Sequence, residues 1–426
     1  MELTILFGVF VLLLLAGVPV AFCLGISSIA TLIYLDIPMI VAFQRMASGI
    51  DVFALMAIPF FIYAGELMNQ SGIAVRLVRF AESLLGRLKG GLGHVSIFAC
   101  MMFGAVSGSA VASVSAMGSS LVPIMKDKGY DEDFAVNVTA TASTTGLLIP
   151  PSHNMIIYSI AAGGGVSIVS LFLAGIVPGL LLGFALMLVT YVMAAKRKYP
   201  RGEFPGWKAA AAAAISAVPG LLSAALIVGG ILSGVFTATE SSAIAVIYTV
   251  IVAVVVYRSL DWRSFVKATR NAVKTTSIVM LIIASASAFG WLMAVAEVPL
   301  RMSEALLAIS DNPLVLMLLI NLILLLLGTF MDMSPLIIIT TPIFLPVVTA
   351  LGMDPVQFGV VLILNLGIGL VTPPVGSVLF VGCAVGNIPI ERSVKTIWPF
   401  YAAMIAVLLL VTAIPLISLG LPNALG

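Results

Sequence analysis

Two stretches, TTGLLIPPSHN (residues 144–154) and GIGLVTPPVGS (residues 367–377), decide how this chain folds. Each places a glycine and two adjacent prolines inside an apolar segment, where proline cannot donate a backbone N–H and therefore breaks a helix. One numbering offset of 223 residues (346 minus 123) lays the second stretch on the first. The same offset carries Pro123, Asp131, Gly146, Pro150 and Pro151 onto Pro346, Asp354, Gly369, Pro373 and Pro374. The sequence therefore predicts an internal repeat.

The composition is that of a membrane protein. Of 426 residues, 61% are hydrophobic and 9% are charged, and the mean hydropathy is +1.22, whereas soluble domains carry about 25% charged residues. Apolar stretches of membrane-spanning length recur along the whole chain. We therefore expect an all-α polytopic membrane protein. Glu2 is the only charge near the N-terminus, which argues against a cleaved signal peptide.

Charged residues predict the orientation of the chain in the membrane. Basic residues concentrate in four connections, at 76–89, 196–208, 258–274 and 392–395, with a weaker fifth site at 126–128. The positive-inside rule places these connections in the cytoplasm. The connections at 36–51, 163–167, 237–240, 297–311 and 352–354 lack this bias and are placed outside. Alternation between the two sides gives ten spans with both termini outside.

Two apolar regions, 91–126 and 313–351, leave from and return to the same side. We expect re-entrant helical hairpins there, because each half is shorter than the roughly 20 residues that a crossing needs. The connectors before them, 73–90 and 298–312, have the pattern of amphipathic helices that lie along the membrane surface. These two arm helices fall on opposite sides, so the repeat is inverted, as in secondary transporters.

The repeat divides the chain into residues 1–208 and 209–426. Scaffold spans are expected at 3–72 and 215–296, broken helices at 131–160 and 355–382, and further spans at 166–195 and 396–418.

The breaks expose oxygen atoms. Pro150 and Pro151 free the carbonyls of Gly146 and Leu147, and Pro373 and Pro374 free those of Gly369 and Leu370. The hydroxyls of Thr144, Thr145, Ser152 and Thr372 lie nearby in the sequence. Carbonyls of half-helices coordinate Na⁺ in broken-helix transporters. The alternative is a proline kink satisfied by hydroxyls and water; two breaks related by the repeat favour the ion.

The hairpin tips are GAVSGSAVASVSAMGSS (104–120) and GTFMDMSP (328–335). The offset lays Ser109 on Asp332, and both are good N-cap residues for the returning half-helix. That half-helix then aims its free N–H groups at the membrane midplane, where they favour a carboxylate. The small residues of the first tip also suit close helix packing, and Asp332 could be only a cap. Glu66 and Glu240 raise the same question as Asp332 in weaker context.

Enzyme motifs are absent from the sequence. The two histidines, His94 and His153, lie far apart and form no H-E-x-x-H motif, and no Walker-type nucleotide motif occurs. His153 follows a proline break and could line the core, although a packed, hydrogen-bonded imidazole is the simpler interpretation. We therefore expect a transporter and not an enzyme, with an intramembrane hydrolase using Ser107 or Ser109 and a passive channel as alternatives.

Several motifs together resemble the large membrane subunit of TRAP (tripartite ATP-independent periplasmic) transporters. They are GVPVAF at Gly17, PFFIYAGELMNQSG at Pro59, GAVSGSAVAS at Gly104, GLLIPPS at Gly146, GVFTATESSA at Gly234 and GLVTPPVG at Gly369. The resemblance implies Na⁺-driven uptake of organic acids across the bacterial inner membrane by an elevator mechanism. It also implies a soluble periplasmic substrate-binding protein and a small four-helix membrane subunit, here as a separate chain. Membrane lipid is expected around the chain, and no nucleic acid.

The family pattern implies two or more Na⁺ ions, at least one in each repeat. The implied ion-binding residues are Ser107, Gly108, Ser109, Thr145, Gly146 and Pro150 in the first repeat, and Gly328, Asp332, Gly367, Gly369 and Thr372 in the second. Ser113, Asn154 and Ser334 are candidate substrate contacts, and Pro151, Pro373 and Pro374 are structural helix breaks. C4-dicarboxylates, sialic acid, keto acids and amino acids all fit such a site. The alternative is a stand-alone Na⁺:anion symporter that works without a binding protein.

Overall fold

A computed structural model describes residues 1–202, 204–310 and 312–425. Within these ranges all regular structure is helical, apart from a single β-bridge between Lys89 and Arg201. The predicted all-α class is confirmed. Its physical basis is that helices satisfy every internal backbone polar group within one segment, which a lipid environment demands.

The helices of the N-terminal half begin and end as follows: α1 Glu2–Leu15, α2 Val20–Tyr34, α3 Ile40–Ile50, η1 Phe53–Met56, α4 Ala57–Gln70, α5 Ile73–Leu85, α6 Gly91–Ser107, α7 Ala110–Asp127, α8 Glu132–Ser143, η2 Thr144–Leu147, α9 His153–Ala161 and α10 Ile168–Lys196. Those of the C-terminal half are α11 Trp207–Leu232, α12 Ala238–Ile251, η3 (a π-helix) Val252–Val256, α13 Trp262–Val295, α14 Val298–Leu307, α15 Pro313–Phe330, α16 Met333–Ala350, α17 Pro355–Gly369, α18 Ser377–Gly386, α19 Ile390–Val394, α20 Trp398–Ala413 and α21 Pro415–Leu425.

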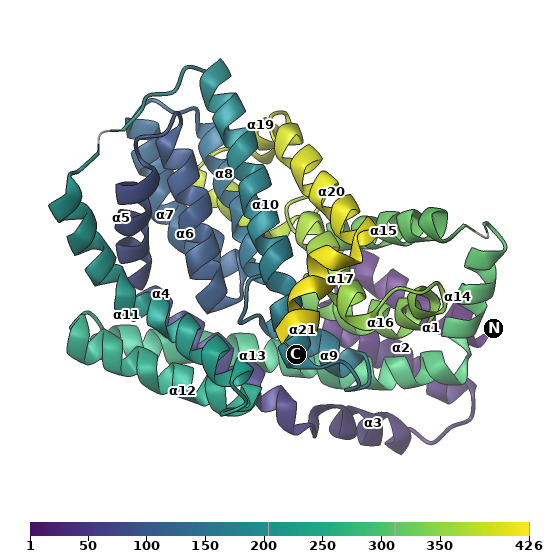
Figure 1. Cartoon of the computed structure of the whole chain (residues 1–426). Coiled ribbons are helices and arrows are strands. Elements are labelled where there is room, and N and C mark those ends of the chain that lie inside the picture. Colours follow the sequence, from purple (N-terminus) through teal and green to yellow (C-terminus); the bar gives the residue numbers. More distant parts are fainter. Residues whose placement is uncertain (203, 311, 426) are drawn as a thin grey trace.

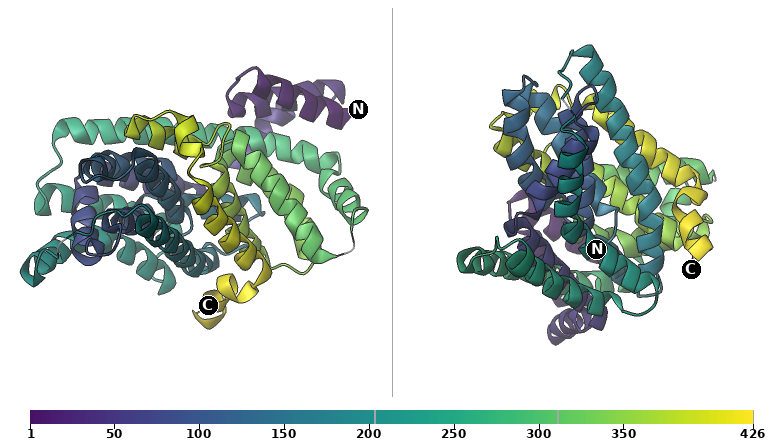
Figure 2. Two further views of the ribbon diagram at one scale, coloured as in Figure 1. Left: turned by 90° about the horizontal axis from the view of Figure 1, so that it is seen from above. Right: turned by 60° about the vertical axis from the view of Figure 1, so that its left-hand side comes forward.

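The long helix α13 organises one group of helices. It packs against α2, α3 and α4, while α12 packs against both α4 and α11. Figure 1 shows α11, α12 and α13 together along one edge of the molecule. In Figure 2 the first helices lie at the periphery, away from the C-terminal end of the chain. We call α1–α4 together with α11–α13 the scaffold group.

A second group of helices surrounds the two double-proline breaks. The α6–α7 hairpin packs on α8, α18 packs on α7 and α8, and the α15–α16 hairpin packs on α17. Helix α10 lies between α6, α17 and α20. Helices α8 and α17 are almost completely buried along their whole length, so we call α6–α9 and α15–α18 the core group. It meets the scaffold group where α13 packs on α16 and where α4 packs on α6 and α9.

Six helices are long and apolar enough to cross a membrane, or eight if each of two bent pairs counts as one span. The six are α10, α11, α12 with η3, α13, α15 and α16. Both α15 and α16 contain 18 residues and are long enough to count as candidate spans, so length alone does not make this hairpin re-entrant, and its re-entrant course stays a prediction. These helices support the assignment of the chain as a multi-pass membrane protein. The predicted number of ten spans is larger than the number of such helices and stays a prediction.

The arm regions are helical but shorter than predicted. Helix α5 ends at Leu85 rather than continuing to residue 90, and the carbonyl of Gly86, the next residue, accepts a hydrogen bond from the Gly202 N–H at 3.0 Å instead of one within a continuing helix. Arg76 of α5 stacks on the Tyr257 ring at 3.8 Å, which anchors this arm to the end of the π-helix. Helix α14 packs on α16; Asp311, within the predicted outer arm, lies outside the described residues.

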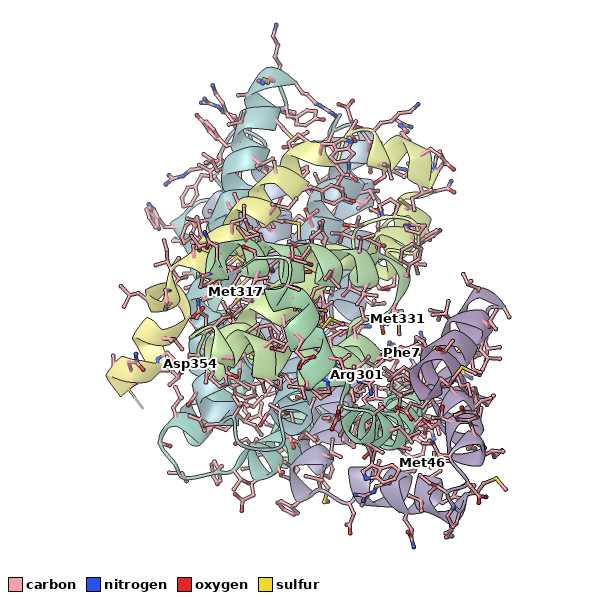
Figure 3. All side chains as sticks on the ribbon, turned by 90° about the vertical axis from the view of Figure 1, so that its right-hand side faces the viewer. Phe7, Met46, Arg301, Met317, Met331 and Asp354 are labelled. Carbon is pink, nitrogen blue, oxygen red and sulfur yellow. The ribbon has the colours of Figure 1, made fainter. Side chains whose placement is uncertain are left out.

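An apolar cavity of about 410 Å³ lies between α1, the second arm α14 and the α15–α16 hairpin. Its lining includes Phe7 of α1, Arg301 of α14 and Met331 at the tip between α15 and α16. Figure 3 shows these three side chains in one region of the molecule, with Asp354 at the start of α17 well apart from them. The second hairpin is therefore not packed tightly against the first helix along its whole length.

Polar contacts tie the core group to α10 at one end. Tyr199 donates a 2.6 Å hydrogen bond to Asp131, and Arg197 contacts the same carboxylate at 2.8 Å. The Tyr199 hydroxyl, with the Arg197 guanidinium, holds the pKa of Asp131 below its ordinary value. Glu132 pairs with both Lys126 and Arg392. These groups lie in the connections that the positive-inside rule places in the cytoplasm.

Candidate functional site

Each hairpin lies against the break of its own repeat through a pair of glycines. A Cβ added to Gly104 of α6 would lie 2.3 Å from the Cα of Gly146, and one added to Gly369 would lie 2.7 Å from the Cα of Gly328 in α15. Neither pair leaves room for a side chain, because the obstructing atoms are backbone. The glycines therefore allow each tip to approach the exposed main chain of its break.

The tips also touch the residues that follow the breaks. Gly108 has φ +62°, and a Cβ there would meet the Nδ1 atom of His153 at 3.1 Å and the carbonyl of Pro151 at 3.3 Å. At the second break, the Val375 N–H donates to the Thr329 carbonyl at 3.1 Å. The Pro150–Pro151 and Pro373–Pro374 peptide bonds are both cis.

The two tip N-caps differ. Ser109 has extended backbone and its side chain accepts a hydrogen bond from the Ala112 N–H at 3.2 Å, as a cap should. Asp332 occupies the equivalent position ahead of α16 but makes no side-chain cap bond. The side chain thus does not make the bond that Ser109 makes as a cap, and a role for Asp332 in ion binding stays a prediction.

The carbonyls at the two breaks also differ. No N–H among the described residues donates to the carbonyls of Gly146 or Leu147. At the second break, by contrast, Thr372 N–H donates to Gly369 at 2.9 Å and Val378 N–H donates to Leu370 at 3.0 Å. The prediction of two bare carbonyls is therefore wrong at the second break. The Gly369 carbonyl is paired within the turn that follows α17, and the Leu370 carbonyl is paired because the first N–H groups of α18 turn back onto it.

Several hydroxyl groups at the breaks donate a hydrogen bond to a backbone carbonyl in the preceding helical turn. Thr145 donates to the Ala142 carbonyl at 2.6 Å and Thr372 to the Ile368 carbonyl at 2.7 Å, which leaves their oxygen lone pairs as acceptors. Ser152 Oγ and His153 Nδ1 are buried without a partner among the described residues. The Nδ1 atom of His153 therefore lacks the hydrogen bond that the simpler interpretation of a packed imidazole expected. Buried polar atoms of this kind normally have a ligand or water.

A polar cavity of about 440 Å³ lies between the tips and the scaffold group. Ser107, Ser109, His153, Asp332 and Ser334 line its core side. Its scaffold side is lined by Glu66 and Asn69 of α4 and by Asn271, Thr275 and Val279 of α13. Asn271 donates to Glu66 Oε2 at 3.2 Å and fixes that carboxylate at the wall. Residues from both repeats thus face one space.

A smaller cavity of about 70 Å³ continues between the two tips. Its lining joins Ser109, Leu147, His153 and Asn154 of the first repeat to Asp332, Met333, Ser334 and Leu370 of the second. Gly367 lies across from the first break, where its Cβ position is 3.3 Å from the Leu147 side chain. The two breaks and both tips are therefore one constellation, although about 180 residues separate them in the sequence (328 minus 146 is 182).

The structure distributes the predicted substrate contacts unequally. Asn154 and Ser334 line the cavities between the tips, whereas Ser113 is fully buried and hydrogen-bonded to Ser107 at 3.3 Å. Glu240 is part of a capping box with Thr237 at the start of α12, away from the cavity. Asn69, Asn271 and Thr275 were missed by the sequence reasoning. Asn69 carries the signal of a polar residue in a largely apolar stretch, whereas Asn271 and Thr275 stand among or beside the basic residues of 258–274 and carry no such signal.

The chemistry of the site is that of oxygen donors. Among the described residues, no group of three or more His, Cys, Asp and Glu side chains could hold a metal ion. Carbonyl, hydroxyl and carboxylate oxygens suit hard cations.

Comparison with known proteins decides the family. The family model described as "Tripartite ATP-independent periplasmic transporter, DctM component" matches residues 7–417. The chain belongs to this family. The membership establishes a transporter permease rather than an enzyme, and it confirms the resemblance that the motifs gave.

Relatives within the DctM family match over almost their full lengths. The sialic acid TRAP transporter large permease protein SiaM of Vibrio cholerae is 41% identical over 96% of both chains. The C4-dicarboxylate TRAP transporter large permease protein DctM of Rhodobacter capsulatus is 35% identical over the whole of both chains. Among solved structures, the YdaH transporter of Alcanivorax borkumensis has a TM-score of 0.65 at 17% identity, covering 96% of this chain and 97% of that one. That likeness concerns the fold alone.

Proposed function

We propose that this DctM-family chain is the large permease subunit of a Na⁺-coupled TRAP transporter that imports a small organic acid anion by an elevator mechanism. The observation that carries the proposal is the convergence of both hairpin tips on one polar cavity, which Asp332 lines without making a side-chain cap bond. The relatives named for sialic acid and for C4-dicarboxylates support an organic acid as the solute.

Na⁺ would bind at the tips and breaks. In the first repeat the donors are the bare carbonyls of Gly146 and Leu147 with the hydroxyls of Thr145 and Ser107. The glycine pair Gly104–Gly146 brings the tip close enough to share such an ion. In the second repeat the Gly369 carbonyl already accepts a hydrogen bond, so the Asp332 carboxylate supplies the charge there. At least one ion in each repeat follows from this division of donors.

The organic acid would bind beside these ions. Helices α7 and α16 both begin at the cavity, and their first N–H groups carry the positive end of the helix dipole. A carboxylate there is stabilised by the dipoles and by Na⁺ bound at Asp332. The solute and the ion then stabilise the same closed arrangement of the tips, which is the physical basis of coupling.

The position of the cavity supports an inward-facing state. Glu66 and Asn69 lie near the end of α4, and Asn271 lies in the first half of α13. Those helix ends adjoin the basic connections that the positive-inside rule puts in the cytoplasm. Transport would then require the core group to slide along α4 and α13. In this proposal the ten spans comprise the single spans and the two broken helices, with both hairpins re-entrant.

The family implies two partners and a compartment. A periplasmic binding protein would deliver the solute, and a small membrane subunit would complete the scaffold in the bacterial inner membrane. These partners distinguish the proposal from a stand-alone Na⁺:anion symporter.

The test is uptake into proteoliposomes that contain this chain and its small subunit. Labelled solute loaded on the cognate binding protein should enter only with an inward Na⁺ gradient, and K⁺ should not replace Na⁺. Asp332→Asn should abolish or uncouple this uptake, while Glu82→Gln, an exposed substitution on α5, should not. Uptake of free solute without any binding protein would select the stand-alone symporter. Flux that ignores the ion gradient would refute Na⁺ coupling.

A further inference from the structure

The cavity between the tips and the scaffold group has a charge that is unexpected for an anion site. Its charged lining residues are Glu66 and Asp332, both acidic, and no lysine or arginine lines it among the described residues. Lys267 is one turn nearer the start of α13 than Asn271, and it lines a separate surface hollow with Arg263 and Arg270. Attraction for an anion is therefore confined to the helix N-termini and to ions bound at the tips.

The cavity consequently has two unlike walls. The tip wall presents the starts of α7 and α16 with Ser109 and Ser334, and it suits one carboxylate. The scaffold wall presents Glu66, Asn69, Asn271 and Thr275. Asn271 contacts only Oε2 of Glu66, and Oε1 accepts no hydrogen bond from the described residues. An ionised carboxylate can only accept hydrogen bonds. A solute that binds at this wall should therefore carry hydrogen-bond donors.

A second carboxylate on the solute would be placed against Glu66. Like charges at close range in a partly desolvated cavity repel strongly. Lys267 acts electrostatically on Glu66 from outside the cavity lining, and among the described residues the lining holds no lysine or arginine that could pair with a second carboxylate. Hydroxyl or ammonium groups at the same place would instead donate to Glu66, with Asn69 and Thr275 available to the remaining hydroxyls.

We propose that the solute is a monocarboxylate whose far end carries hydrogen-bond donors, hydroxyl or ammonium groups, and that Glu66 excludes dicarboxylates. This inference rests on the proposed function, because it assumes that the transported acid occupies this cavity. It narrows the solute to hydroxylated acids or amino acids. Specificity then arises from a repulsive group as well as from attractive ones.

The first experiment measures ligand-induced thermal stabilisation of the purified chain with its small subunit in NaCl. Four ligands at equal millimolar concentration separate the chemistries: gluconate, serine, succinate and butyrate. We expect gluconate or serine to raise the melting temperature, and succinate and butyrate to leave it unchanged. A rise with gluconate would indicate recognition of hydroxyl donors, and a rise with serine alone would indicate recognition of an ammonium donor. The inference would be overturned if succinate raised the melting temperature as much as, or more than, gluconate and serine do. It would also be overturned if none of the four ligands raised it.

The second experiment repeats the panel with Glu66→Gln. Loss of a charged acceptor should weaken the apparent affinity for gluconate or serine by about tenfold or more, and succinate should begin to bind. The exposed Glu82→Gln variant is the matched control and should behave as wild type. Unchanged selectivity in Glu66→Gln would contradict the role of this carboxylate.

These outcomes are separable from failure of the proposed function. Na⁺-dependent binding and uptake of succinate would remove the inference and leave a Na⁺-coupled organic acid transporter. Absence of Na⁺-dependent uptake for every acid delivered by the binding protein would remove the proposed function itself.

Discussion

Replacing both prolines of the first break should weaken sodium dependence far more than the same change at the second break. In Pro150→Ala/Pro151→Ala the new N–H groups can reach the Gly146 and Leu147 carbonyls, which receive no hydrogen bond in the described structure. Each new bond contributes about 1 kcal/mol net. The hydrogen-bonded form then competes with the ion-bound form by about 2 kcal/mol, or roughly a 30-fold rise in the Na⁺ concentration for half-maximal uptake.

The second break supplies a matched control. In Pro373→Ala/Pro374→Ala, the Gly369 and Leu370 carbonyls already accept N–H groups of Thr372 and Val378, so little is gained by new donors. We expect a change of about threefold or less in sodium dependence, which corresponds to less than 1 kcal/mol. The assay is initial-rate uptake over a range of Na⁺ concentrations in proteoliposomes. Equal shifts of the half-maximal Na⁺ concentration in both double variants, or no shift in the first, would refute the role of the unpaired carbonyls at the first break.

Three further predictions follow from other contacts. Gly146→Ala places a Cβ 2.3 Å from the Gly104 Cα, so the hairpin must move by about 1.1 Å to reach the ordinary 3.4 Å; we expect a loss of about 1–3 kcal/mol and a lower melting temperature, whereas Gly229→Ala, which meets nothing within 4 Å, should be neutral or slightly stabilising. Asp332→Asn should reduce Na⁺ binding, measured by Na⁺-dependent thermal stabilisation, with folding retained; full Na⁺ stabilisation would argue against this carboxylate as an ion ligand. The pKa of Asp131 is held low in the folded chain, so the stability that its ionised carboxylate contributes is present above about pH 4 and is lost as the pH falls through that lowered pKa. The difference in melting temperature between wild type and Asp131→Asn should therefore vanish in strong acid. A difference that persists there would argue against the ionised contact with Tyr199 and Arg197.

Much of the site could be predicted from sequence because its main elements are local. Proline pairs remove N–H groups wherever they stand in a helix, so both breaks were visible in the sequence. Ser109 and Asp332 were recognised as helix starts because N-cap positions follow short-range rules. The amphipathic arm at α5 was equally plain, although beyond Leu85 the Gly86 carbonyl pairs with Gly202, which is more than a hundred residues away in the sequence.

The errors concern hydrogen bonds whose partners the break and tip residues do not by themselves specify. Whether Leu370 keeps a bare carbonyl depends on where α18 begins, and Val378 happens to donate to it. Whether Asp332 caps its helix depends on competition with the cavity that it faces. Neither outcome is encoded in the residues next to the break. Only the packing of one helix on another determines them.

The sequence by itself determined the membrane class and the positions of the two breaks and two tips, because hydropathy and backbone chemistry act over a few residues, and it predicted the repeat. The tertiary structure decided which oxygens stay free and what faces them. Glu66 and Asn271 are 205 residues apart and meet across α4 and α13, and they form the wall opposite the tips. A polar residue inside a span gains its meaning from its neighbour across the cavity, and that neighbour is set by the packing of whole helices.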